Sequence, residues 1–186
     1  RGTKDKTHQQ IQDELDGLGA TLSFSSSAGA LDISILAKRK TLPQVLALAK
    51  EIIESPSFPE EELQVMLQQR ITSLEASKSE PQTLAMNLLA RKMTPYPADD
   101  IRATLPVEQQ IERLKSVTLE DVVKLYEQQI GNQSGELVAV GDFDIEEITP
   151  LIQDSVKTLT SNVSYQRIGN TPFLDVKCGH ETIVTP

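Results

Sequence analysis

The chain is poor in the residues that most often build reactive or cross-linked sites. Its 186 residues include one cysteine, two histidines and no tryptophan, and only 4% of them are aromatic. A single cysteine excludes an internal disulfide framework. Three thiol and imidazole side chains are also few for a zinc site, which takes roughly three or four protein ligands. Leucine, isoleucine, valine and alanine must therefore fill the interior.

The charge balance disfavours two classes of partner. The chain has 18 basic and 27 acidic residues, so its formal net charge is −9. Nucleic-acid binding depends on clustered lysine and arginine side chains that release counterions, and an anionic membrane surface attracts the same clusters. No apolar run approaches the roughly 20 residues that span a bilayer. We therefore expect neither a nucleic-acid partner nor a membrane span.

The clearest local pattern is a helix followed by a hairpin. Thr7 can cap the helix with Gln10 as its reciprocal partner, and Gly19 can adopt the left-handed conformation that ends it. Alternating apolar and polar residues then predict strands at residues 20–25 and 31–38. The apolar side of these strands consists of Ala20, Leu22, Phe24, Leu31, Ile33 and Ile35.

The remaining chain is mainly helical in pattern, with one more strand and one ordered loop. Further helices are expected to begin near Thr41, Phe58, Pro81, Pro106, Thr118 and Ile145. A third strand is expected at residues 136–140. The Thr-Pro-Tyr-Pro run at residues 94–97 cannot be regular helix, because each proline restricts the residue before it. These elements predict an α+β fold, in which an antiparallel sheet has helices mostly on one face.

Four stretches carry a resemblance to a known family. They are R-G-T-K at residues 1–4, F-P-E-E-E-L at residues 58–63, S-V-T-L-E-D-V-V-K-L-Y at residues 116–126 and L-V-A-V-G-D-F-D at residues 137–144. In order and spacing they resemble the insulinase/pitrilysin family of zinc metalloproteases, which includes the mitochondrial processing peptidases. The resemblance implies a metalloprotease-like half-domain with an antiparallel or mixed sheet.

The resemblance also implies where the domain lies in the chain. It covers residues 1–159, and the N-terminal strand and helix of the domain would precede Arg1. Residues 160–186 contain the runs S-N-V-S at residues 161–164 and G-N-T-P at residues 169–172, which are typical of a linker. In the family such a segment leads to a following domain.

The position of zinc in catalytic copies of the domain is a second implication. The inverted motif H-x-x-E-H supplies two histidine ligands and a general base, and it would lie upstream of Arg1. The third ligand is a glutamate on the helix that follows residues 58–63. An ungapped match places Thr72 there, and the nearest carboxylate is Glu75. Because threonine is a poor zinc ligand, we expect no metal-binding, catalytic or cofactor-binding residue in this chain.

The favoured function is a later, non-catalytic copy of the protease domain. Family members carry several copies, of which one holds the metal while the others help to enclose the peptide. Zinc and peptide hydrolysis would then belong to another domain of the parent protein. The partners would be those domains or subunits and the peptide substrate. Bacterial relatives are commonly exported, which favours a periplasmic location, and an unpaired sheet edge predicts a homodimer.

Two other functions remain open. The chain could be a truncated catalytic copy, in which Glu75 shifts into place through a gap and a zinc-bound water attacks the peptide carbonyl. It could instead be a scaffold subunit of a larger complex, as relatives of this fold are in respiratory complexes. The residues upstream of Arg1 would distinguish the first alternative, and co-purification with partner subunits would favour the second.

Other side chains with reactive chemistry fit simpler interpretations. Cys178 and His180 could place two donors close together, but they are too few for a zinc site. His8 fits an exposed position in a first helical turn. The acidic run Glu60-Glu61-Glu62 suits the positive end of a helix dipole better than a cation site. Tyr96 either packs within its loop or contacts a substrate.

Overall fold

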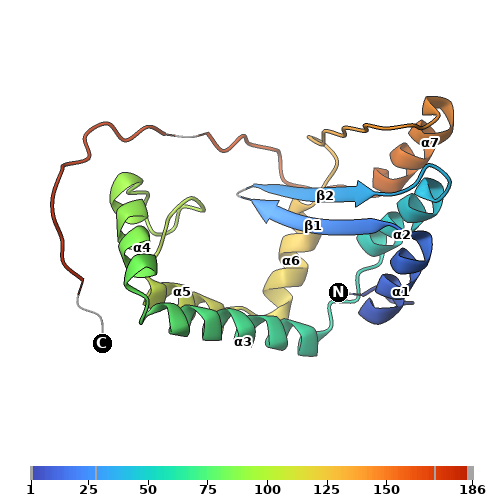
Figure 1. Cartoon of the computed structure of the whole chain (residues 1–186). Coiled ribbons are helices and arrows are strands. Elements are labelled where there is room, and N and C mark those ends of the chain that lie inside the picture. Colours follow the sequence, from blue (N-terminus) through green and yellow to red (C-terminus); the bar gives the residue numbers. More distant parts are fainter. Residues whose placement is uncertain (1, 28, 170, 184–186) are drawn as a thin grey trace. The chain divides into compact units, whose positions relative to one another are not determined.

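The computed structural model describes residues 2–27, 29–169 and 171–183 and has the α+β fold that the sequence predicts (Figure 1). Within these residues there are seven helices and two strands. The elements are α1 (His8–Leu18), β1 (Thr21–Ser27), β2 (Ala30–Leu36), α2 (Leu42–Glu54), α3 (Glu60–Ser77), α4 (Pro81–Met93), α5 (Val107–Ser116), α6 (Leu119–Gln129) and α7 (Ile145–Val156). Arg1, which opens the R-G-T-K run, lies outside the described residues.

The chain divides into two compact units. Unit 1 comprises the described residues of Arg1–Glu62 and Leu119–Arg167, and unit 2 those of Leu63–Thr118 and Ile168–Pro186. Unit 1 holds α1, β1, β2, α2, α6 and α7, and unit 2 holds most of α3 together with α4 and α5. The described residues of the expected linker from Ile168 onward are thus grouped with α4 and α5.

α1 begins and ends as predicted. The Thr7 Oγ1 accepts a hydrogen bond from the Gln10 backbone N–H at 3.2 Å, and the Gln10 Oε1 accepts one from the Thr7 N–H at 2.8 Å. Both halves of the capping box are therefore present. Gly19 ends the helix at a φ of 60°. The core that α1 shares with α2 consists of Ile11, Leu15, Val45 and Leu48.

The G-T-K run connects the start of α1 to α2. The Thr3 side chain is 4% exposed, and its hydroxyl donates to the Glu51 Oε1 at 2.7 Å while accepting from the Lys6 N–H at 2.9 Å. The Lys6 Nζ lies 2.9 Å from the Glu51 Oε2 and 2.8 Å from the Glu14 Oε2. Thr3 also forms an isolated antiparallel bridge with Pro56. A small residue with a hydroxyl group therefore suits this position.

β1 and β2 form the predicted antiparallel hairpin (Figure 1). Leu22 lies opposite Ile35 and Phe24 lies opposite Ile33, so all four side chains share one face. Leu22 and Ile35 pack against the core of α1 and α2, whereas Phe24 and Ile33 are 41% and 37% exposed. The second strand ends at Leu36, before the expected end at residue 38.

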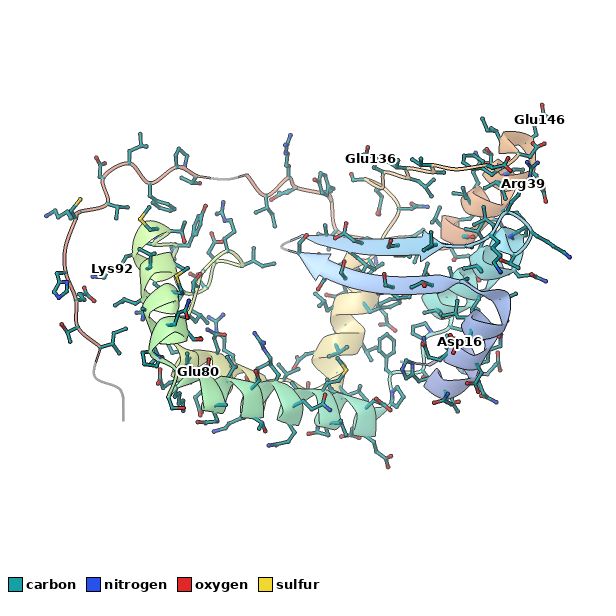
Figure 2. All side chains as sticks on the ribbon, viewed as in Figure 1. Asp16, Arg39, Glu80, Lys92, Glu136 and Glu146 are labelled. Atoms are coloured by element: carbon teal, nitrogen blue, oxygen red, sulfur yellow. The ribbon has the colours of Figure 1, made fainter. Side chains whose placement is uncertain are left out.

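The strand expected at residues 136–140 is not formed, so that prediction was wrong. This segment, in which Figure 2 labels Glu136, has no regular secondary structure. Val138 and Val140 are 76% and 94% exposed. Alternating side chains stabilise a strand only when a neighbour takes up its backbone hydrogen bonds. In the part of the chain that the structure describes, β1 and β2 pair only with each other, so the sheet is purely antiparallel.

α6 and α7 both contact α2 in unit 1. The Tyr126 hydroxyl of α6 donates to the backbone oxygen of Ile53, and its ring meets that of Phe58 edge-on at 5.3 Å between centroids. An ion pair joins Lys50 of α2 to Asp154 of α7. These contacts link segments that are far apart in sequence, so they determine the packing of unit 1.

Unit 2 has a small core between α3, α4 and α5. Its buried members are Leu74, Val107 and Ile111, with Ile71, Leu84 and Leu114 packed against them. The apolar side chains of α3 are only partly buried, and Met66, for example, is 46% exposed. α3 therefore presents apolar surface to its surroundings.

Candidate functional site

Thr72 and Glu75, the positions compared with the third zinc ligand, are exposed on α3. The Thr72 Oγ1 accepts a hydrogen bond from the Gln68 Nε2 at 3.4 Å. The Glu75 Oε2 pairs with the Lys78 Nζ at 2.7 Å. Among the described residues, no three His, Cys, Asp or Glu side chains lie close enough together to hold a metal ion. Thr72 and Glu75 thus each interact with one neighbouring side chain on the surface of α3.

The other reactive side chains lie at exposed positions. His8 begins α1. Cys178 and His180 lie in the tail, which here means the described residues 168–169 and 171–183, and these have no regular secondary structure. Glu60, Glu61 and Glu62 occupy the first turn of α3, as predicted, where carboxylates interact favourably with the helix dipole.

Unit 2 has an open pocket of about 320 Å³ at the end of α4. Its walls are the last turns of α4, the loop of residues 94–106 and the first turn of α5. Leu88, Leu105 and Tyr96 contribute apolar surface. Arg91 and Lys92 supply the charge, and no aspartate or glutamate occurs among the described residues that line it. The charged residues that line the pocket are therefore all basic, in a protein of net charge −9.

Tyr96, Arg102 and Asp100 form one cluster beside the pocket. The Arg102 guanidinium lies over the Tyr96 ring, 4.2 Å from its centroid. The Arg102 Nε and NH2 donate to the Asp100 carboxylate at 2.9 and 2.6 Å. These hydrogen bonds are the main cause that lowers the pKa of Asp100 to about 2, and they raise the pKa of Arg102. Both groups are consequently charged at neutral pH, and they hold the Tyr96 ring from one side.

Side chains from the neighbouring helices fix the loop. The Asn87 Nδ2 of α4 and the Gln110 Nε2 of α5 both donate to the backbone oxygen of Leu105, at 3.0 and 2.8 Å. The Arg113 NH2 donates to the backbone oxygen of Ala98 at 2.6 Å. This pattern confirms the ordered loop predicted from the two prolines.

The tail of the chain lies against the same cluster. The Tyr96 hydroxyl accepts a hydrogen bond from the Thr171 N–H at 3.2 Å, and the Phe173 ring meets the Tyr96 ring edge-on at 4.9 Å. The Arg102 NH1 donates to the backbone oxygen of Gly169 at 2.5 Å. Lys92, labelled on α4 in Figure 2, pairs with Glu181 of the tail. Tyr96 therefore packs and hydrogen-bonds, as the simpler interpretation predicted, and its partners include a segment of extended chain.

Sequence reasoning selected Tyr96 but not the cations around it. Arg91 and Lys92 come directly before the proline-containing loop, and Arg102 comes within it. Two adjacent basic residues next to a rigid aromatic loop, in an acidic chain, are a signal that could have indicated this pocket.

No family model matches the sequence, and no curated protein matches it closely. Among solved structures, the chain is similar to the crystal structure of a peptidase M16 inactive domain from Pseudomonas fluorescens, with a TM-score of 0.71 and 17% sequence identity. That likeness covers 92% of this chain. The chain therefore shares its fold with part of that solved structure. This agrees, at the level of fold, with the resemblance to the insulinase/pitrilysin family.

The present chain spans less than half the length of that solved structure. The likeness covers 41% of that relative's chain. None of the helices in the described part of the present chain combines the length and apolar composition needed to cross a membrane.

Proposed function

We propose that the chain is a non-catalytic domain of an insulinase-like zinc metalloprotease, where it helps to close the chamber around the peptide. The proposal rests on the ungapped match that puts Thr72 where the family resemblance expects the third zinc ligand. Its hydroxyl is a poor zinc ligand and accepts a hydrogen bond from Gln68 at 3.4 Å. The nearest carboxylate, Glu75, is paired with Lys78. The fold of an M16 inactive domain supports the same assignment.

Exposed apolar surface on unit 2 supports a place within a larger protein. On α3 Val65 and Met66, and on α4 Met86, Leu89 and Met93, are between 46% and 59% exposed. Apolar side chains gathered on neighbouring elements commonly mark a surface that another domain or subunit covers. The zinc and the hydrolysis would belong to such a domain, and the enclosed peptide would be its substrate. An exported, periplasmic location is part of the proposal.

A homodimer through the hairpin is a further part of the proposal. β1 and β2 pair only with each other among the described residues, so each leaves its outer edge without a neighbouring strand. Unpaired strand edges favour pairing with a second chain. Sedimentation that shows only monomer over a range of concentrations would contradict it.

Zinc calorimetry on the full chain tests the non-catalytic role. We expect no stoichiometric binding, and we expect the Thr72→Val and Glu75→Gln variants to behave as the wild type does. Sub-micromolar, one-to-one binding that Glu75→Gln abolishes would overturn the proposal and favour a truncated catalytic copy.

Assembly with a partner chain tests the role in a protease. A chain carrying H-x-x-E-H should cleave a peptide library only when combined with the present chain, and Glu75→Gln should leave that cleavage unchanged. Stable co-purification with partner subunits that cleave no peptide would instead indicate a scaffold subunit.

A further inference from the structure

Unit 2 already holds one extended peptide segment, the described residues 171–183 of the same chain. The described residues 171–183 have no regular secondary structure. They are held by a backbone hydrogen bond from Thr171 to Tyr96, by the edge-on contact of Phe173 with Tyr96, and by the ion pair of Glu181 with Lys92. An N–H group, an aromatic ring and a carboxylate are features that many extended peptides share.

The receiving surface is organised without the tail. The Tyr96 ring is held by Arg102, which is fixed in turn by Asp100, and the loop is anchored through Leu105. A surface whose side chains are held by their own neighbours binds a ligand with less loss of conformational entropy. Tyr96 is therefore preorganised for a second aromatic ring.

The pocket beside this surface stays open when the tail is bound. All its lining residues lie within residues 88–109, so no tail side chain lines it. Its charged lining residues, Arg91 and Lys92, are basic, and Lys92 already pairs with a carboxylate of the tail. This charge pattern complements an acidic segment and repels a basic one.

We propose that Tyr96, Arg102, Arg91 and Lys92 form a subsite for extended peptides that carry an aromatic side chain followed by a carboxylate, at a spacing like that of Phe173 and Glu181. The tail occupies the subsite within the same chain and competes with the ligand. The proposal deepens the proposed function and rests on it in one respect, because the enclosed substrate would supply the peptide.

A fluorescently labelled peptide tests the subsite directly. Its sequence is that of residues 171–183 with serine in place of Cys178, and its binding to the full chain is followed by anisotropy. A tethered segment competes at an effective concentration in the millimolar range. The variant Phe173→Ala/Glu181→Gln should therefore bind the peptide at least about tenfold more tightly than the wild type does.

Matched substitutions in that double-variant background locate the site. Tyr96→Ala should weaken peptide binding by about fivefold or more, in line with the strength of an aromatic pair. Lys92→Glu should also weaken peptide binding. This loss of affinity should grow as the salt concentration is lowered, because like charges then repel more strongly. The controls are Tyr165→Ala, which removes an exposed tyrosine of unit 1, and Lys115→Glu, which reverses a charge on α5. Both should leave the affinity unchanged.

Three results would overturn the proposal. They are equal affinity of the wild type and the double variant, equal losses in Tyr96→Ala and Tyr165→Ala, and equal binding of a peptide in which the aromatic and acidic residues are replaced by alanine and glutamine. Tyr96→Phe keeps the ring and removes only the hydroxyl, so it should bind within about threefold of the parent variant and guards against misfolding of Tyr96→Ala. Zinc calorimetry and cleavage by the assembled protease do not depend on this pocket, so they report separately on the proposed function.

Discussion

Replacing Thr3 by valine should destabilise unit 1 by about 2 kcal/mol, because valine has nearly the same shape but cannot form hydrogen bonds. The Thr3 hydroxyl donates to Glu51 at 2.7 Å and accepts from the backbone N–H groups of Lys6 and Asp5 at 2.9 and 3.2 Å. With the side chain only 4% exposed, water cannot readily replace these partners. A buried donor or acceptor left without a partner costs about 1–3 kcal/mol, so a loss near the middle of that range is expected.

The same variant should change how stability depends on pH. Hydrogen bonds from Lys6 first and from Thr3 second lower the pKa of Glu51 below its ordinary value of 4.5. A carboxylate with a lowered pKa stabilises the folded state above its unfolded value, and this contribution is lost as the pH falls through the folded value. Valine removes part of the lowering of the Glu51 pKa. The difference in free energy of unfolding between variant and wild type should therefore be larger at pH 7 than at pH 3.

Urea unfolding followed by far-UV circular dichroism measures both effects. Thr158→Val is the matched control, because the Thr158 hydroxyl also donates to a glutamate, Glu54, at 2.7 Å but is exposed. It should cost less than about 0.5 kcal/mol. A Thr3→Val variant within 0.5 kcal/mol of the wild type, or a control with an equal loss, would refute the assigned role of the buried hydroxyl.

Two more substitutions probe unit 2 and the corrected segment of unit 1. Asp100→Asn should loosen the loop of residues 94–106 and speed its amide hydrogen exchange at pH 7, because it removes the charge that holds Arg102. In the wild type the same loosening should come only as the pH falls through about 2, the pKa of Asp100. Ile111→Ala, at a site 2% exposed, should cost about 2–5 kcal/mol in urea unfolding. By contrast, Val140→Ala, at a site 94% exposed, should stay within about 0.5 kcal/mol of the wild type, and a large loss there would mean that residues 136–140 are packed after all.

The best sequence predictions concerned contacts between near neighbours. The cap of α1 joins Thr7 to Gln10, and Gly19 ends the helix through its own backbone conformation. The hairpin of β1 and β2 likewise follows from alternation in adjacent segments. The comparison of Thr72 with a zinc ligand stays a prediction, and the structure shows only that Thr72 lies on α3 with Gln68 as a surface partner.

The sequence by itself determined which segments form helices, where α1 is capped and that a hairpin follows it, because these features depend on interactions within a few residues. Only the tertiary structure decided that residues 136–140 form no strand, that Thr3 is buried against Glu51 and that the Tyr96 ring packs on Phe173. Each of these depends on a partner far away in the chain. The local sequence of a segment is the same whether or not a distant strand or ring pairs with it, so the local sequence alone does not decide the pairing.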